Sequence, residues 1–450
     1  MLPRPIFSIG FFAFVMLAAA TPMLAQVEPS ATGTDEGSLD ESQMMTPPPV
    51  SGIAYPSGAA SDQRSNYLGA KLTFSPAYID NVLPGTGLTP VSDEIYSILP
   101  GVSFDRSAPR QKAEFTYNPS FTFYQHTTSL DAVDHNASAL FEYRFSPKLA
   151  FSAQDSFTRT SNVYDSPGLI SSPITGSTLA PTLTVIAPYA EQMMNTVDGV
   201  LSYQFALNAM VGGGGSYNIF DFPNPAQAQG LFNSHQAAGF VFYSRRLSRA
   251  QYLGVQYEYA RIDANPVTGV VEAQIHSLLP FYTVYFNKSF SFSISAGVQR
   301  VEFSQPGLAQ FNAWSPTGTA SAGWQGQRGS VAASFTRTVI SGEGLLGAYN
   351  SNSASATGGW KIANTWDGAL FAGYSSISSA TPVTSAPFQS GNTLTGGATL
   401  QHSFGERWNA GFQYQHLHEN YNGISAVNAT PDSNREALTI SYQLRKPLGR

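Results

Sequence analysis

The sequence lacks several features that water-soluble and redox proteins of this size usually carry. It has no cysteine in 450 residues, which excludes disulfides, thiolate metal sites and cysteine nucleophiles. Only 12% of the residues are charged. An average soluble domain has about 25%, so the deficit disfavours an ordinary cytoplasmic enzyme. The net charge of −6 includes no basic block, and this argues against a nucleic-acid partner.

Aromatic residues and glycine are plentiful instead. Aromatic residues make up 13% of the chain, and there are 40 glycines. Disordered chains combine high charge with few aromatic residues, which is the opposite balance. The composition is therefore typical of a chain that folds within a membrane.

The first 25 residues have the layout of a secretory signal peptide. Arg4 supplies a positive charge, an apolar run covers residues 6–20, and cleavage is expected after Ala25 or Ala20. A membrane anchor helix is the alternative. The run is shorter than the roughly 20 residues needed to span a bilayer, which favours cleavage.

Residues 26–64 change to a composition of Ser, Thr, Gly, Pro, Asp and Glu. Little in this segment could be buried in a core, so we expect a disordered periplasmic linker rather than a plug for a pore.

From residue 65 to residue 450 the dominant pattern is alternation with period two, which predicts β-strands. In the segment 113–123, Phe115, Phe121 and Phe123 share one face, and Glu114 and Thr116 lie on the other. No later apolar run is long enough for a transmembrane helix. The sequence therefore predicts an all-β domain made of amphipathic strands.

The connections between these strands alternate in length. Tight turns are expected at 146–148, 206–208, 247–249, 287–289, 325–328, 363–365 and 405–407. Longer loops are expected near 79–92, 125–135, 160–195, 219–234, 262–271, 304–314, 339–352, 377–391 and 419–434. Short turns at one end and long loops at the other predict a transmembrane antiparallel up-and-down β-barrel, with periplasmic turns and extracellular loops.

Counting in this way gives roughly 18 strands, with 16 as the alternative, and an even number returns both termini to the periplasmic side. The expected strands cover 66–75, 93–105, 111–124, 136–146, 149–159, 196–207, 208–218, 235–246, 250–261, 272–286, 290–303, 315–325, 329–338, 353–362, 366–376, 392–403, 407–418 and 435–445.

The tryptophans support a barrel in lipid. Trp324, Trp360, Trp366 and Trp408 lie close to expected tight turns, and Trp314 lies at the opposite end of its strand. Strand ends are where an interfacial aromatic girdle belongs, because the rings settle at the level of the lipid headgroups.

Three features do not fit a regular barrel strand. Pro100, Pro119 and Pro280 fall inside expected strands, where each removes a ladder hydrogen bond. Asp155 shares the parity of apolar neighbours and would face lipid unless a bulge intervenes. The run 212–215 is all glycine, which indicates a bend or a close backbone approach.

The sequence resembles those of bacterial outer-membrane β-barrel proteins in three features: the signal peptide, the alternation of short turns with long loops, and the aromatic girdle. The strand count is similar to that of porins. The resemblance covers residues 65–450 and rests on architecture, with no diagnostic motif. It implies a bacterial outer-membrane location and partnership with outer-membrane lipid and the barrel-assembly machinery. Barrels of this kind often end in an aromatic residue, whereas this chain has Tyr442 in its last strand and continues to Arg450.

A barrel of about 18 strands is wide enough for an aqueous channel unless loops fill it. The polar face of the strands supplies the pore-lining candidates, which are mostly neutral and carry a few charges of both signs. They are Lys71, Glu114, Thr116, Asn118, Ser120, Glu142, Arg144, Gln154, Asp198, Gln204, Gln299, Lys361, Gln401 and Gln413. Without a ring of one charge sign, weak selectivity for small solutes is expected.

The histidines do not assemble a catalytic or metal site. Asp134-His135 and Ser234-His235 are neighbours along a strand, so their side chains point to opposite faces. His416 and His418 share a face, but no carboxylate at fixed spacing completes a metal site. We therefore expect no enzymatic activity, no metal and no cofactor.

The function predicted from the sequence is passive diffusion of small solutes through a porin-like channel. The alternative is a closed structural, receptor or adhesion barrel that acts through its extracellular loops. The oligomeric state stays open.

Overall fold

The computed structural model describes residues 66–83, 89–161, 190–224, 228, 231–264, 270–287, 289–304, 310–342, 345–380, 390–422 and 432–448. All of these belong to one compact unit, Ser42–Arg450. The signal peptide expected at 1–25 and the linker expected at 26–64 lie outside the described residues and stay predictions. Residue 65, where the barrel was expected to begin, also lies outside them.

Eighteen strands and one short 3₁₀ helix make up the regular structure of the described residues. The strands are β1 (Tyr67–Ile79), β2 (Asp93–Ala108), β3 (Gln111–Tyr124), β4 (Ala132–Ser146), β5 (Leu149–Thr160), β6 (Gln192–Ala206), β7 (Ala209–Asp221), β8 (Ser234–Ser248), β9 (Gln251–Ala264), β10 (Val271–Asn287), β11 (Phe290–Ser304), β12 (Phe311–Gln325), β13 (Gly329–Gly342), β14 (Leu345–Ala363), β15 (Trp366–Ser379), β16 (Ser390–Phe404), β17 (Trp408–Asn422) and β18 (Asp432–Pro447). The helix η1 (Thr128–Leu130) lies between β3 and β4.

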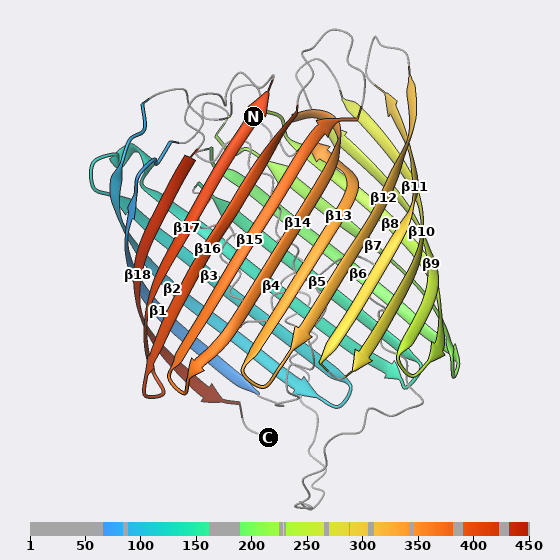
Figure 1. Cartoon of the computed structure of the whole chain (residues 1–450), viewed down its shortest axis with the longest axis horizontal. Coiled ribbons are helices and arrows are strands. Elements are labelled where there is room, and N and C mark those ends of the chain that lie inside the picture. The colour runs from blue at the N-terminus through green and yellow to red at the C-terminus, as the bar shows by residue number, and fades with distance from the viewer. Residues whose placement is uncertain are drawn as a thin grey trace, which may run out of the picture. The chain divides into compact units, whose positions relative to one another are not determined.

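The strands close into a single barrel (Figure 1). Every strand pairs antiparallel with its neighbours in the sequence, and β1 also pairs with β18, Tyr67 facing Pro447 and Ile79 facing Arg435. The predicted all-β, antiparallel up-and-down barrel of about 18 strands is confirmed. In the described part of the chain, no helix has the length and apolarity to cross a membrane.

Alternation along each strand separates an outer from an inner face. In β1, Leu72 and Phe74 are 54% and 44% exposed, whereas Thr73 and Ser75 are 8% and 4% exposed. The large apolar side chains therefore face outwards and the small polar ones face the lumen, which is the reverse of a water-soluble protein and the arrangement of a barrel in lipid.

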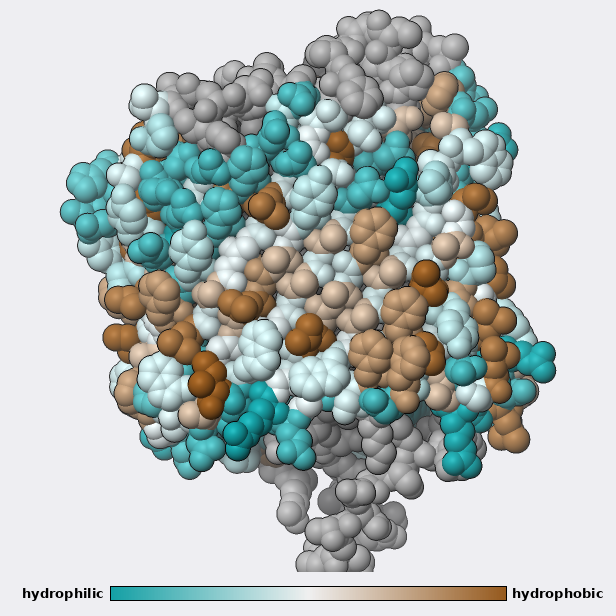
Figure 2. Space-filling model, viewed as in Figure 1, coloured by the Kyte–Doolittle hydropathy of each residue, from teal (hydrophilic) through white to brown (hydrophobic). Residues whose placement is uncertain are grey.

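The outer surface carries its apolar residues in a belt towards the tight-turn end (Figure 2). Towards the loop end, the outer face becomes polar: Glu94 on β2, His416 on β17 and Asn434 and Glu436 on β18 all share the outward parity of the apolar residues below them. The strands thus extend beyond the belt on the loop side.

Connections at the turn end are short, as the sequence predicted. Two-residue turns occur at 109–110, 147–148, 207–208, 249–250 and 364–365. The turn at 405–407 begins with Gly405 at φ +67°, a left-handed conformation that a residue with a Cβ adopts only with strain.

Strand ends differ from the prediction mainly on the loop side. β4 begins at Ala132 instead of 136, and β14 begins at Leu345 instead of 353. The expected loop at 339–352 was wrong, because β13 and β14 continue through most of it. At the loop end of other strands, as at His416 and Asn434, the outward positions are polar, so the alternation that identified the strands is lost there.

The prolines interrupt individual ladders without breaking the strands. Pairing between β2 and β3 is missing between Ile98↔Phe121 and Val102↔Tyr117, where the register places Pro100 opposite Pro119. Pairing between β10 and β11 is likewise missing between Leu278↔Val298 and Phe281↔Ser295. Each gap costs the ladder bonds that proline cannot donate.

The glycine run of β7 allows close approach of aromatic rings. A Cβ on Gly212 would lie 2.4 Å from the Phe242 ring, and one on Gly214 would lie 2.8 Å from the Phe240 ring. These two glycines are therefore covered by phenylalanines of β8 on the inner face of the barrel.

Asp155 remains on the outward parity, since the β4–β5 register has no bulge beside it. Asp155 is 6% exposed, and its carboxylate accepts a hydrogen bond of 2.8 Å from the Asn195 amide of β6. The neighbouring amide thus partners a carboxylate that faces away from the lumen.

Candidate functional site: the barrel lumen

All fourteen pore-lining candidates have inward parity, opposite to the exposed apolar side chains of the same strands. The exposed ones are Lys71, Asn118, Glu142, Arg144, Lys361 and Gln401. Those of intermediate exposure are Glu114, Thr116, Gln154, Asp198 and Gln413. The buried ones are Ser120, Gln204 and Gln299. Their role in lining a pore stays a prediction.

Exposed inward side chains concentrate in the half of the barrel that ends in tight turns. They carry both charge signs: Lys112 Nζ lies 2.9 Å from Glu114 Oε1, and Lys361 faces Asp367 across β14 and β15. Such paired charges give the wall no strong preference for anions or cations. This half of the lumen is accessible to water and polar.

The inward face near the loop end is packed instead. Ile79, Ile95 and Leu417 are at most 1% exposed and belong to one apolar cluster. Ser97 and Thr122 are each 1% exposed, and their hydroxyls lie 3.2 Å apart. The lumen therefore changes from water-accessible to closely packed along its axis.

The hairpin of β13 and β14 contributes to this packing because it leaves the wall near the loop end. β12 extends to Phe311, but its pairing with β13 stops at Gly318↔Arg337. Beyond Arg337, β13 continues to pair with β14, for example through Val339↔Asn350. The end of the hairpin, residues 338–351, is called the hairpin tip below.

One face of the hairpin tip packs against the inner wall of β9, β10 and β11. Val339 and Ala348 are 4% and 1% exposed, and both have the outward parity of their strands. They join one cluster with inward-facing residues of the neighbouring strands β9, β10 and β11, namely Ala260, Ile262, Val271, Ala273, Ile275, Val301 and Phe303. An outward face can meet an inner wall only if the tip bends into the barrel.

The other face of the hairpin tip packs on β15 and β17. Leu345 and Tyr349 form a cluster with Ile377 and Tyr421, and all four are at most 3% exposed. The tip therefore lies between two walls of the barrel and narrows its loop end. This element was not predicted from the sequence, in which residues 339–352 indicated a loop.

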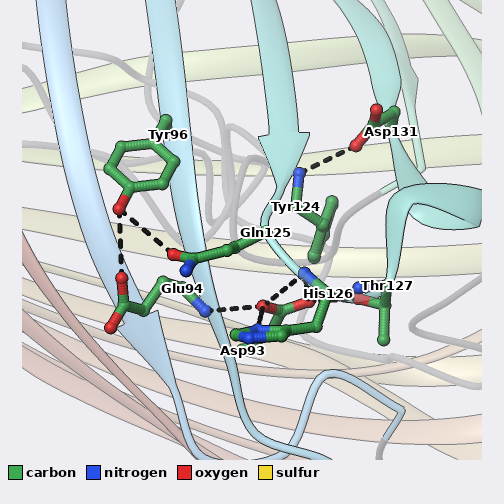
Figure 3. Close-up of polar contacts among 8 residues, drawn as sticks. All are labelled: Asp93, Glu94, Tyr96, Tyr124, Gln125, His126, Thr127 and Asp131. Atoms are coloured by element: carbon green, nitrogen blue, oxygen red, sulfur yellow. Dashed lines mark hydrogen bonds and ion pairs between the residues drawn. The ribbon is translucent and has the colours of Figure 1, made fainter.

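The loop-end rim is held together by Asp93, the first residue of β2 (Figure 3). Its carboxylate accepts hydrogen bonds from the backbone N–H and hydroxyl of Thr127 at 2.7 and 2.6 Å and from the backbone N–H of His126 at 3.1 Å. His126 Nδ1 lies 3.0 Å from the same carboxylate. Nearby, Tyr96 donates to Glu94 at 3.0 Å. These contacts fix the turn after β3 on the end of β2.

We expect this rim contact to weaken in acid. Burial alone would raise the pKa of Asp93, but the hydrogen bonds from Thr127 and His126 outweigh it and lower the pKa to about 2 from 3.8. A lowered folded-state pKa gives stability that is full above about pH 4 and is lost as the pH falls through about 2, worth about 2 kcal/mol.

Amide exchange is the measurement. Between pH 5 and pH 2, the protection factors of the His126 and Thr127 amides should fall by roughly tenfold or more, after correction for intrinsic exchange. Asp93→Asn should abolish this pH dependence. An equal pH dependence in Asp93→Asn would contradict the assignment.

Both histidines considered as catalytic bases, His135 and His235, lie on the outer face. His135 faces outwards with its Nδ1 2.9 Å from the Tyr117 hydroxyl, whereas Asp134 has the inward parity. His235 lies 3.5 Å from Asp263 across β8 and β9, and Ser234 has the opposite parity. In neither pair does the histidine lie on the same face of the strand as the residue before it, so it cannot hydrogen-bond to that side chain as a catalytic base would.

His416 and His418 share the outer face of β17 but make separate contacts. His416 Nδ1 lies 2.9 Å from Asn434 Oδ1, and His418 Nδ1 lies 2.7 Å from Asp432 Oδ1. No group of three or more potential metal ligands occurs among the residues that the structure describes. The absence of a metal and of a cofactor stays a prediction.

The five tryptophans all have outward parity and are 39–70% exposed. Trp324, Trp360, Trp366 and Trp408 lie at the turn end and Trp314 lies towards the loop end. This placement is the one a girdle requires, and its role as a lipid anchor stays a prediction.

Comparisons with known proteins find relatives of the fold only. No protein-family model matches the chain, and no curated protein matches it. Among solved structures, OccAB4 of Acinetobacter baumannii is 8% identical with a TM-score of 0.39 and covers 86% of this chain and 100% of its own. OpdK of Pseudomonas aeruginosa, described as an outer membrane protein, is 10% identical with a TM-score of 0.39, covering 84% and 99%.

The FrpB iron transporter of Neisseria meningitidis (F3-3 variant) is also similar, at 10% identity and a TM-score of 0.38, covering 84% of this chain and 82% of its own. The closed 18-stranded barrel of this chain, with its apolar outer belt, confirms, at the level of fold, the predicted resemblance to outer-membrane β-barrel proteins.

Proposed function

We propose that the protein is a porin-like channel in the bacterial outer membrane, through which small solutes diffuse passively. Its tight turns lie in the periplasm and its long loops outside the cell. The observation that carries the proposal is the polar, water-accessible inner face of the turn-end half, with Lys71, Asn118 and Gln401 exposed inside a closed barrel of 18 strands.

The hairpin tip is the constriction of this channel. It lies between the β9–β11 wall and the β15–β17 wall, so solutes pass beside it at the extracellular mouth. Below the mouth the lumen has charges of both signs, which suits small neutral or zwitterionic solutes better than strongly charged ones.

The proposal also includes partners. The apolar outer belt contacts outer-membrane lipid. The outward-facing Tyr442 near the end of β18 is the aromatic residue available to the barrel-assembly machinery. Small solutes are the cargo, and we propose no enzymatic reaction for the barrel.

Planar lipid bilayers test the channel. Purified, folded barrel should give stepwise increases in current that are nearly ohmic and only weakly selective between K⁺ and Cl⁻. Heat-denatured protein at the same concentration is the control. Folded protein that inserts without any conductance step would contradict the channel.

A closed receptor or adhesion barrel is the second candidate, favoured by the packing of the loop-end interior around Ile79, Ile95 and Leu417. It would use its extracellular loops, above all the connection between β5 and β6, residues 161–191. Deleting most of that loop should then abolish binding to a partner or surface and leave folding intact, whereas a channel keeps its conductance.

A further inference from the structure

Glu419 of β17 is a buried carboxylate with no role in the proposed passive diffusion. It is 2% exposed and has the inward parity of Leu417 and Tyr421. Neither Oε1 nor Oε2 has a hydrogen-bond partner in the part of the chain that the structure describes. Burying an ionised carboxylate without a partner costs several kcal/mol, so a partner of positive charge would gain strongly there.

A second acceptor without a partner lies beside it. Glu419 faces Thr393 across β16 and β17, and Thr395 is the next inward residue of β16, diagonal to Glu419. Thr395 is 3% exposed, and its Oγ1 has no partner among the described residues. Diagonal neighbours on one face of a sheet are close enough for their side chains to share a ligand.

Aromatic rings and a hydroxyl pair close the same site. The hydroxyls of Thr393 and Tyr421 hydrogen-bond at 2.6 Å. Tyr421 also packs with Tyr349 of the hairpin tip. Tyr421 shares the inward face of β17 with Glu419, two residues along the strand, so a cation held by Glu419 would lie close to a tyrosine ring, which attracts positive charge.

The number and type of acceptors favour an organic cation over a metal ion. Glu419 Oε1, Glu419 Oε2 and Thr395 Oγ1 are three acceptors, and a primary ammonium group has three N–H donors. Calcium takes six to eight oxygen ligands and magnesium takes six, and these side chains supply far fewer.

We propose that Glu419 and Thr395 form a binding site for the primary ammonium group of a small organic cation at the constriction of the barrel. The ammonium group donates to the carboxylate and to the threonine hydroxyl, and its alkyl part lies against Tyr421 and Leu417. The inference rests on the proposed function only in that the cation reaches the site through the channel. The hairpin tip must shift to admit the cation.

Calorimetric titration of the folded, detergent-solubilised barrel tests the site without measuring transport. The probes are propylammonium, tetramethylammonium, which has no N–H donor, and propionate. Propylammonium should bind, tetramethylammonium should bind at least tenfold more weakly, and propionate should not bind. Equal binding of propylammonium and propionate would overturn the proposal.

Three variants locate the binding. Glu419→Gln keeps the shape and removes the charge, so propylammonium affinity should fall at least tenfold. Thr395→Val should lower it severalfold. Glu436→Gln makes the same chemical change on the outer face of β18 and should leave the affinity unchanged. Heat-modified electrophoretic mobility verifies folding of each variant.

The outcomes separate this site from the channel. Conductance with no propylammonium binding overturns the site and leaves the channel standing. Binding that Glu419→Gln abolishes, in a barrel without conductance, overturns the channel and supports the site. An affinity that is the same in Glu419→Gln and in the unmodified protein shows that the carboxylate does not hold the cation and ends the proposal.

Discussion

Removing the hairpin tip is expected to raise the single-channel conductance several-fold. Thr338 and Ser351 face each other in the β13–β14 ladder, so a two-residue Asn-Gly turn can join them in place of residues 339–350. The deletion removes Val339, Leu345 and Tyr349 from between the two walls. It costs the last two β14–β15 pairs, which Tyr349 and Asn350 make, and leaves the rest of that ladder in place. The widened mouth then passes more ions.

The matched control shortens the 84–88 connection at the same end of the barrel, which leaves the hairpin tip in place. Its conductance should stay within a factor of about two of the unmodified protein, because the tip still sets the narrowest section. If the two deletions change the conductance equally, or if the hairpin deletion changes nothing, the tip is not the constriction.

Thiol accessibility is expected to differ by about two orders of magnitude between the two halves of the lumen, because reaction needs an exposed thiolate. The absence of cysteine makes single-cysteine variants unambiguous. Asn118→Cys and Gln401→Cys replace exposed inward residues and should react rapidly with a charged methanethiosulfonate. Ser97→Cys and Thr122→Cys replace residues that are 1% exposed and should react slowly.

Leu72→Cys supplies the control for the outer face. Leu72 is 54% exposed on the apolar belt, so in a bilayer lipid should shield the introduced thiol from a charged reagent, whereas in detergent the shielding weakens. Rapid reaction at Thr122→Cys, or slow reaction at Asn118→Cys, would contradict the division of the lumen into an accessible and a packed half.

The barrel could be predicted from the sequence because lipid imposes alternation on every strand that crosses it. Phe290, Phe292 and Ile294 face outwards and Ser291 and Ser293 face inwards, as the period of two requires. The same rule assigned all fourteen inward candidates to the lumen side. Tight turns could be found because they interrupt this alternation.

The hairpin tip could not be found in this way because both of its faces are buried. Val339 packs on one wall and Ile340 lies beside the cluster on the other, and Leu345 follows the turn. Apolar residues therefore stand next to each other before and after Gly342, and the segment shows no alternation of apolar and polar residues. For this reason a loop was predicted there. A strand buried on both faces loses the alternating signal.

Glu419 and Asp93 were missed for a different reason. Inward parity does not reveal how deeply a side chain is buried, which for Glu419 depends on elements across the lumen. The role of Asp93 depends on His126 and Thr127, more than 30 residues away in the sequence. Such contacts depend on how neighbouring strands are aligned along one another in the closed barrel, and a single sequence does not specify this alignment.

The most direct test of the proposed function is the current through the Asn118→Cys barrel in a planar bilayer. Asn118 lies midway along β3 and is exposed to the lumen, so ions that cross the barrel pass this position. Adding a bulky charged thiol reagent on the periplasmic side should reduce the current of each open channel in discrete steps, and a reducing agent should restore it. A steady current that the reagent leaves unchanged, despite complete labelling of the thiol, would contradict conduction through the lumen.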